Sequence, residues 1–258
     1  MQVIDPLGNK VNCTQAPQRI VSLVPSQTEL LFDLGLGNQV VGITKFCIHP
    51  ATEVSKITQV GGTKNCRLEI IASLQPDLII ANKEENTQSD IETLQQQFSV
   101  YVSDITTLSD AYRMIEDIGK ITFKEAEAQH IQQQISKSLA AIQVAEKKSA
   151  LYFIWRKPWM TVGADTFIHH MMNELGFINL AADKKRYPEL SMEQIQSLNP
   201  AYILLSSEPF PFKQRHIDEL QAICPTAQIK LVDGEIFSWY GSRLLHAASY
   251  YKNYLQTI

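Results

Sequence analysis

The 258-residue chain lacks any apolar run approaching the roughly 20 residues that a membrane-spanning helix needs. It begins without the basic cluster and apolar stretch that open a secretory signal peptide. Basic residues are scattered and the formal net charge is −4, which argues against a nucleic-acid partner or a polybasic membrane anchor. We expect a periplasmic or cell-surface protein if an export signal has been removed ahead of Met1, and a cytoplasmic one if Met1 is the native start.

Metal-binding patterns are also lacking. The four cysteines show neither a CxxC motif nor zinc spacing, which favours unpaired thiols over a disulfide between Cys47 and Cys66. His169 and His170 are adjacent on a predicted helix and so face different directions, which makes the pair a poor metal site. His49 is a lone loop histidine near Cys47, and a ligand role there is the less favoured interpretation. We expect no metal site and no intrinsic cofactor.

Catalytic motifs are missing as well. The chain has no G-x-S-x-G elbow, P-loop, H-E-x-x-H or G-x-G-x-x-G pattern. Glu84 and Glu85 are adjacent acids on a predicted loop, where such pairs are usually solvated. We predict that the protein is not an enzyme.

The chain does contain an alternation of strands and helices. Apolar runs at Arg19–Val24, Val40–Ile43 and Asp77–Ala81 are typical of strands buried on both faces of a parallel sheet. Ser26 and Glu29 form an S-x-x-E capping box that predicts the start of a helix, which stops at Gly35 and Gly37. Further predictions are helices over 68–74 and 90–98 and a strand over 100–102. This order predicts an α/β lobe with a mainly parallel sheet.

Residues 108–148 form a different kind of segment. They contain no proline and a single glycine, Gly119, and the apolar residues recur at helical spacing at Ile131, Ile135, Leu139 and Ile142. A surface helix over one sheet would explain this pattern, but strand-type sequence restarts at residue 150, so we favour a long helix joining two lobes. The predicted organisation is an N-terminal α/β lobe over 1–107, a linking helix region over 108–148 and a C-terminal α/β lobe over 149–258.

The second half echoes the first. Residues 68–80 (LEIIASLQPDLII) match residues 192–204 (MEQIQSLNPAYIL) as a short helix, a proline break and a buried strand. Leu34–Asn38 and Leu175–Asn179 form a second echo in the same order, each closing the helix after a lobe's first strand. Self-similarity at this distance indicates two related lobes.

Ligands of open α/β sheets bind beyond the carboxyl ends of the strands. The segments that follow the predicted strands, such as 44–47, 156–159, 206–210 and 237–240, hold or adjoin all three tryptophans, Trp155, Trp159 and Trp239. An aromatic-lined cleft suits a flat or bulky ligand, although the same side chains also serve as core, and the residues alone leave both roles open.

One glutamate lies near the start of each repeated helix, Glu69 in the first half and Glu193 in the second. Acidic groups at these positions stabilise a helix N-terminus through its dipole. They would also give two matched charges, one per lobe, to a two-fold symmetric partner. Composition alone favours the structural role.

Several segments together resemble the cobalamin-, siderophore- and haem-binding receptors of ABC importers. They are Pro17–Glu29 (PQRIVSLVPSQTE), Val41–Thr44, Gly61–Gly62, Leu74–Ile80 (LQPDLII) and Gly241–Leu244 (GSRL). The resemblance implies two Rossmann-like lobes joined by one long backbone helix, with the ligand in a cleft between the lobes.

The resemblance also implies site residues and partners. Glu69 and Glu193 fall on the positions that dock the cobalamin members onto a permease dimer, whereas Thr63 replaces a ligand-packing aromatic, and Glu235 and Trp239 replace an acidic–basic pair. We expect a monomer that binds cobalamin or a related corrinoid, with aromatic faces in apolar contact and Lys64 and Asn65 at polar edges of the ligand. The predicted ligand-binding residues are Phe46, Thr63, Lys64, Asn65, Trp159, Phe210, Trp239 and Tyr240.

Three alternatives stay open. One is a haem or ferric-siderophore receptor on the same scaffold. Another is a cytosolic tetrapyrrole- or metal-handling enzyme or chaperone, which turnover or a metal held by Cys47 and His49 would favour. The third is a direct metal-ion receptor, against which the six scattered histidines argue.

Overall fold

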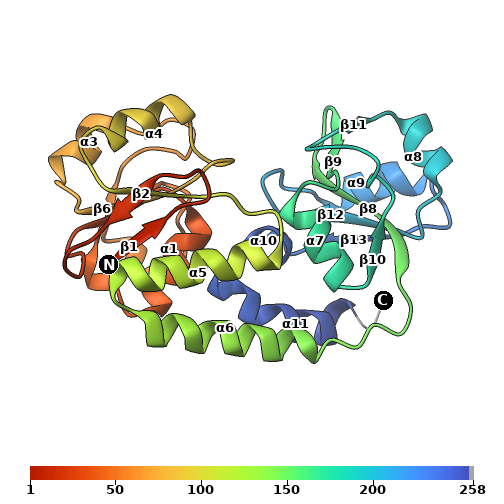
Figure 1. Cartoon of the computed structure of the whole chain (residues 1–258). Helices are drawn as coiled ribbons and strands as arrows, with labels where there is room; N and C mark the ends of the chain where they lie inside the picture. The colour runs from red at the N-terminus through yellow and green to blue at the C-terminus, as the bar shows by residue number, and fades with distance from the viewer. Residues whose placement is uncertain (256–258) are drawn as a thin grey trace. The chain divides into compact units, whose positions relative to one another are not determined.

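The computed structural model describes residues 1–255 and divides into two compact units (Figure 1). Unit 1 comprises Met1–Ile105, Ser109–Ser136 and Tyr240–Leu245, and unit 2 comprises Thr106–Leu108, Lys137–Trp239 and the chain from His246. Each unit has its own mainly parallel sheet, which confirms the predicted α/β fold class. Within residues 1–255, no helix combines the length and the apolar character that crossing a membrane requires.

Unit 1 is built on a five-stranded parallel sheet. Its order is β5 (Thr58–Gln59), β4 (Val40–Ile43), β3 (Ile20–Ser22), β6 (Leu78–Asn82) and β7 (Val100–Ser103). Every residue of β3, β6 and β7 is buried, as expected for strands covered on both faces. The connections include α1 (Pro25–Asp33), α2 (Ala51–Val54), α3 (Leu68–Ser73) and α4 (Gln88–Gln95). A hairpin of β1 (Gln2–Ile4) and β2 (Lys10–Asn12) precedes the sheet.

The start of α1 differs from the predicted capping box. The helix begins at Pro25, and its N-cap residue Val24 makes no side-chain hydrogen bond. Proline suits the first helical position because its missing N–H would be unbonded there anyway. Glu29 therefore lies inside the helix, where it pairs with Arg243. The helix ends as predicted, with Gly35 in the left-handed conformation at φ 76°.

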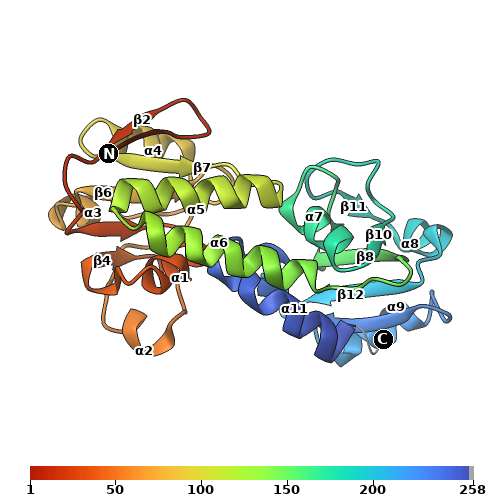
Figure 2. The ribbon, with the colours of Figure 1, turned by 60° about the horizontal axis from the view of Figure 1, so that its bottom comes forward.

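Two helices occupy the segment that was predicted to be one long helix. They are α5 (Leu108–Thr122) and α6 (Glu125–Ala140), which lie side by side in both ribbon views (Figure 1 and Figure 2). Phe123, at φ 60°, turns the chain between them. A Cβ on Gly119 would lie 2.5 Å from the Cβ of Ala128, so the glycine allows the two helices to approach closely. The division between the units falls within α6, after Ser136.

Unit 2 repeats the order of unit 1 with one change of direction. Its path is β11 (Glu189–Leu190), β9 (Trp159–Thr161), β8 (Lys148–Trp155), β12 (Tyr202–Ser206) and β13 (Gln228–Val232), and β10 (Phe177–Asn179) also pairs with β8. Strands β8, β12 and β13 are parallel, whereas β9 returns from β8 as a hairpin. The helices of this unit include α7 (Phe167–Glu174), α8 (Met192–Leu198), α9 (Gln214–Gln221), α10 (Gly234–Ser238) and α11 (Ala247–Tyr250).

The internal repeat is visible in the backbone. Helix α3 leads to β6, and α8 leads to β12, which is the fourth strand of its sheet as β6 is of the other. The residue before each proline break is left-handed, Gln75 at φ 45° and Asn199 at φ 44°. The second echo agrees too, since Gly35 and Gly176 both have positive φ just after a helix end. Two positions with matching unusual φ values support the sequence match as a structural repeat.

Candidate ligand-binding site

Each sheet has a switch point where the strand order changes direction. In unit 1 it lies between β3 and β6, and in unit 2 between β8 and β12. Open α/β sheets bind ligands beyond the carboxyl ends of the strands at such a point. Each unit therefore has its own candidate ligand-binding loops, those after β3 and β6 in unit 1 and those after β8 and β12 in unit 2.

The switch point of unit 1 is closed by amide side chains. Asn86 Nδ2 donates to the carbonyl oxygens of Leu23 (3.2 Å) and Thr63 (3.0 Å), and Asn86 Oδ1 accepts from the backbone N–H of Asn82. Asn82 Oδ1 accepts from the backbone N–H groups of Glu84 and Glu85. These bonds hold the loops after β3, β5 and β6 to one another.

Side chains behind this loop cluster form a second buried network. Thr28 Oγ1 contacts Ser22 Oγ (2.8 Å) and Cys47 Sγ (3.1 Å), and Thr44 Oγ1 lies 3.3 Å from the same sulfur. Burial raises the pKa of the Cys47 thiol, with the Thr28 and Thr44 hydrogen bonds acting the other way. All four cysteines are free thiols, as the sequence favoured, so Cys47 and Cys66 are not joined. Cys47 serves as a packed, bonded core residue.

Four predicted ligand residues of unit 1 lie in the loops after β4 and β5, and Tyr240 follows α10. Phe46 is 49% exposed, and the Nζ of Lys45 lies 5.0 Å from its ring centroid. Lys64 Nζ donates to the carbonyl oxygen of Glu84 at 2.6 Å, so this ammonium is already bonded to protein. Tyr240 donates its phenolic O–H to Glu85 Oε1 at 3.5 Å. Thr63 is half-buried, and Asn65 is exposed.

A half-buried carboxyl occupies the switch point of unit 2. Glu208 lies two residues beyond β12, and its Oε1 accepts from Ser238 Oγ (2.9 Å) and Trp239 Nε1 (3.0 Å). Desolvation raises the pKa of Glu208, the two hydrogen bonds lower it, and the acids Glu235 and Asp233 raise it further. Glu208 lies in the segment 206–210 that the sequence marks as a candidate, but it is not among the predicted ligand-binding residues. The internal repeat is a signal that could have identified Glu208. When residues 192–204 are aligned with residues 68–80, Glu208 occupies the position equivalent to Glu84.

The predicted aromatic residues of unit 2 divide between core and surface. Trp159 belongs to the core, stacked on Phe212 at 5.8 Å and edge-on to Phe153 at 5.1 Å. Phe210 is half-buried and contacts Trp155 edge-on at 5.5 Å, with Trp155 40% exposed. Trp239 is bonded to Glu208 through its indole N–H. The ligand-binding roles of the eight predicted residues stay predictions.

Glu69 and Glu193 occupy equivalent, exposed positions. Each lies in the first turn of its helix, α3 or α8. A capping box of Ser191 and Gln194 opens α8, and Ser191 Oγ also donates to Glu193 Oε2 at 2.7 Å, which lowers the pKa of this carboxyl. Arg67, the N-cap residue of α3, makes no side-chain cap, so the two helix starts differ in their local bonding.

The histidines were expected to be poor metal ligands. His169 follows the N-cap Thr166 and bonds Asn173 and Asn179, and desolvation lowers its pKa. His170 lies 3.8 Å from Glu174. In the described part of the chain, no group of three or more His, Cys, Asp or Glu side chains is placed to hold a metal ion.

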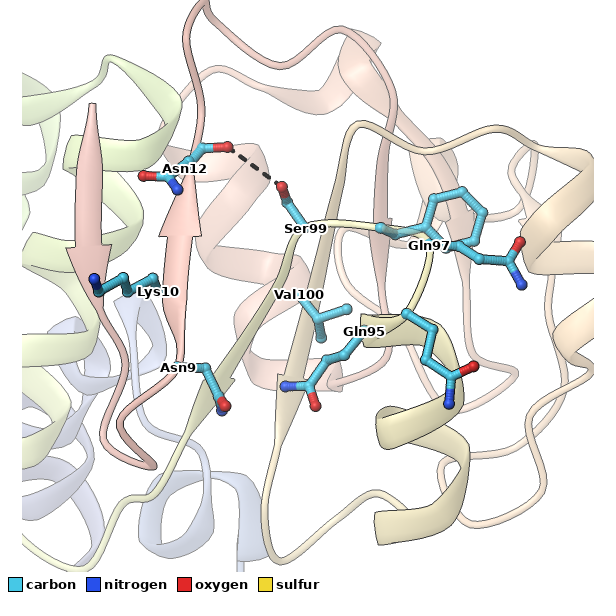
Figure 3. A pocket seen from close by; sticks show the side chains of 9 residues that line it. Asn9, Lys10, Asn12, Gln95, Gln97, Ser99 and Val100 are labelled. Atoms are coloured by element: carbon cyan, nitrogen blue, oxygen red, sulfur yellow. Dashed lines mark hydrogen bonds between the residues drawn. The ribbon is translucent and has the colours of Figure 1, made fainter.

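A polar hollow of about 490 Å³ lies elsewhere on unit 1 (Figure 3). Amide side chains from Asn9, Asn12, Gln95 and Gln97 line it, and Ser99 Oγ donates to the carbonyl oxygen of Asn12 at 3.3 Å. The hollow lies beside the start of β7, at the amino ends of the parallel strands. Because ligands of this sheet type bind at the opposite ends, we do not include the hollow in the candidate site.

Comparison with known protein families matches residues 20–228 to the periplasmic binding protein family. The chain belongs to this family. The predicted resemblance to binding proteins of ABC importers is thereby confirmed.

Individual relatives of the chain are also described as binding proteins. An uncharacterized ABC transporter substrate-binding lipoprotein of Bacillus subtilis, YvrC, is 33% identical over 78% of this chain and 68% of its own length. The vitamin B12-binding protein of Vibrio parahaemolyticus is 28% identical over 73% of this chain and 70% of its own length.

Solved structures share the fold. The periplasmic vitamin B12-binding protein BtuF of Vibrio cholerae aligns with a TM-score of 0.79 at 23% identity, covering 93% of this chain and 97% of that one. The periplasmic heme-binding protein RhuT of Roseiflexus sp. RS-1 aligns with a TM-score of 0.80 at 20% identity, covering 91% and 97%. At these identities the likeness establishes the two-lobe fold and leaves the ligand open.

Proposed function

We propose that the protein is the extracytoplasmic substrate-binding component of an ABC importer, and that it carries cobalamin or a related corrinoid to a membrane permease. Family membership supports the transport role, and relatives at 28% identity described as vitamin B12-binding proteins support the corrinoid. The loops at the two switch points would supply the ligand contacts, including the predicted Phe46, Thr63, Lys64, Asn65, Trp159, Phe210, Trp239 and Tyr240.

The observation that carries the delivery role is the repeat of α3 and α8. It presents one exposed glutamate per unit, Glu69 and Glu193, at the same position of the same short helix. A two-fold symmetric permease offers two equivalent patches, and equivalent carboxylates complement basic groups on both. A dipole role explains an acid in each first turn, but it does not require the same exposed position on the equivalent helix of both units.

Charge reversal tests this function. We expect Glu69→Lys/Glu193→Lys to abolish capture by the detergent-solubilised permease while the protein keeps its affinity for cobalamin, measured by titration of tryptophan emission. The control is Glu53→Lys/Glu189→Lys, which reverses the charge of two other exposed acids, one in each unit. This variant should dock normally. Equal loss of docking and of cobalamin affinity in the Glu69/Glu193 variant would contradict the assignment, as would unimpaired docking.

A further inference from the structure

The carboxyl of Glu208 is held by the protein on one side only. Ser238 and Trp239 both donate to Oε1, and among residues 1–255 the structure records no hydrogen bond or ion pair to Oε2. Oε2 is also not fully buried, because in the described part of the chain the fully buried side-chain atoms without a partner are Ser26 Oγ, Gln27 Oε1, Gln39 Oε1 and Ser242 Oγ. One oxygen is anchored, and the other is neither hydrogen-bonded to the protein nor fully buried.

The surrounding backbone fixes the position of this carboxyl. The N–H of Glu208 donates to Ser206 Oγ at 3.3 Å, and the N–H of Gly234 donates to Ser207 Oγ at 2.9 Å. A Cβ on Gly234 would lie 2.7 Å from Glu208 Cγ, so glycine lets the start of α10 close against the glutamate stem. A side chain held in this way pays little further entropy when it binds a ligand.

The charge around Glu208 is acidic. Asp233 and Glu235 flank Gly234, whose Cβ position lies 2.7 Å from Glu208 Cγ, and both acids raise the pKa of Glu208. A ligand that presents carboxylates here would meet a half-buried acid and two like charges. A ligand that presents N–H groups would instead satisfy the open lone pairs of Oε2.

We propose that Glu208 determines ligand specificity as a fixed hydrogen-bond acceptor that selects chelates with N–H donors at their edge, such as primary carboxamides, over chelates with carboxylates. This inference rests on the proposed function and narrows it. Among metal chelates it favours the amide-bearing corrinoids over haem, whose two propionates are anionic. The position of Glu208, at the carboxyl end of β12 beside the switch point, is where a ligand of this sheet is expected.

Two corrin ligands with the same ring test the proposal. Dicyanocobinamide carries peripheral carboxamides, and dicyanocobyrinic acid carries carboxylates in their place. We expect the wild-type protein to bind the amide form at least tenfold more tightly in calorimetric titration at pH 7. In Glu208→Gln the side-chain amide keeps an acceptor for Ser238 and Trp239 but puts an N–H₂ donor where Oε2 was, so the preference should fall to threefold or less.

Glu189→Gln is the matched control, since it removes the same charge from an exposed position of the same unit and should leave the tenfold preference unchanged. Glu208→Met, which removes the acceptor at similar volume, should also lose the preference and guards against a folding defect peculiar to glutamine. Equal binding of the two ligands by the wild-type protein, or an unchanged preference in both Glu208 variants, would overturn the inference and spare the corrinoid function. Failure of the wild-type protein to bind either ligand would overturn the proposed function and this inference together.

Discussion

Glu29 and Arg243 form a nearly buried ion pair between the opening and closing motifs of the chain. Arg243 Nη2 donates to Oε1 at 2.6 Å and Nε donates to Oε2 at 3.0 Å, and the two side chains are 14% and 13% exposed for arginine and glutamate. Burial raises the pKa of Glu29, whereas Arg243 lowers it. The bidentate geometry ties the segment 240–245 to α1 within unit 1.

Removal of this arginine should destabilise the protein mainly when Glu29 is ionised. We expect Arg243→Ala to lower the free energy of unfolding by about 3 kcal/mol at pH 7, because it leaves a carboxylate largely buried without its partner. The loss of Arg243 raises the pKa of Glu29 in the folded state further above its unfolded value. Below the pKa that Glu29 has in the unfolded chain, its carboxyl is protonated in both the folded and the unfolded state. The loss of unfolding free energy caused by Arg243→Ala should therefore shrink toward pH 4.

Urea unfolding followed by circular dichroism at the two pH values measures this difference. Arg243→Lys keeps the positive charge but cannot make the bidentate contact, so it should lower the free energy of unfolding by less than Arg243→Ala does. A penalty of the same size at pH 7 and pH 4 would contradict the electrostatic account, because loss of packing alone does not depend on the ionisation of Glu29.

This pair also marks what the sequence could predict about single residues. Both members lie in segments that resemble the receptor family, but they are 214 positions apart, and no local pattern indicates that one binds the other. Glu29 looked like part of a capping box because S-x-x-E fits that motif, yet the proline at the first helical position starts the helix one residue before Ser26. Pairing across the chain requires the fold.

Among the elements, the sequence predicted helices and buried strands well and missed a turn. The apolar spacing through residues 108–148 reads as one helix because periodicity continues on both sides of Phe123. The turn itself rests on a left-handed phenylalanine at φ 60°, a conformation that its residue type gives no reason to expect. The hairpin of β1 and β2 was also missed, since strands of three residues leave too little alternation to detect.

The antiparallel packing of α5 and α6 depends on Gly119. We expect Gly119→Ala to destabilise the protein by about 1–3 kcal/mol, because the new Cβ would lie 2.5 Å from the Cβ of Ala128. Alanine otherwise favours a helix by up to about 1 kcal/mol over glycine, so the sign of the change separates packing from propensity.

Ala128→Gly in the same protein should recover part of that loss, since it removes the opposing methyl group. Thermal unfolding of the two single variants and the double variant gives the coupling. Stabilisation by Gly119→Ala alone, or strict additivity of the two changes, would show that the helices do not meet at this point.

At the scale of the whole molecule, the repeat relates two units whose sheets share a strand order and whose helix–proline–strand segments share a left-handed residue. The sequence predicted this duplication, because the matching positions are local in each half. For the candidate site, the sequence predicted only which loops contribute, because each such loop directly follows a predicted strand. It did not distinguish Glu208 within its candidate segment, because the proposed role of this residue depends on the two donors that α10 and its C-cap residue bring to it.

The central claim is that the protein binds a corrinoid in preference to other metal chelates. Native mass spectrometry of the protein with an equimolar mixture of cobalamin, haemin and a ferric hydroxamate siderophore tests it most directly. The account predicts one dominant adduct, with a single cobalamin per protein chain. A dominant haemin or siderophore adduct, or none at all, would contradict it.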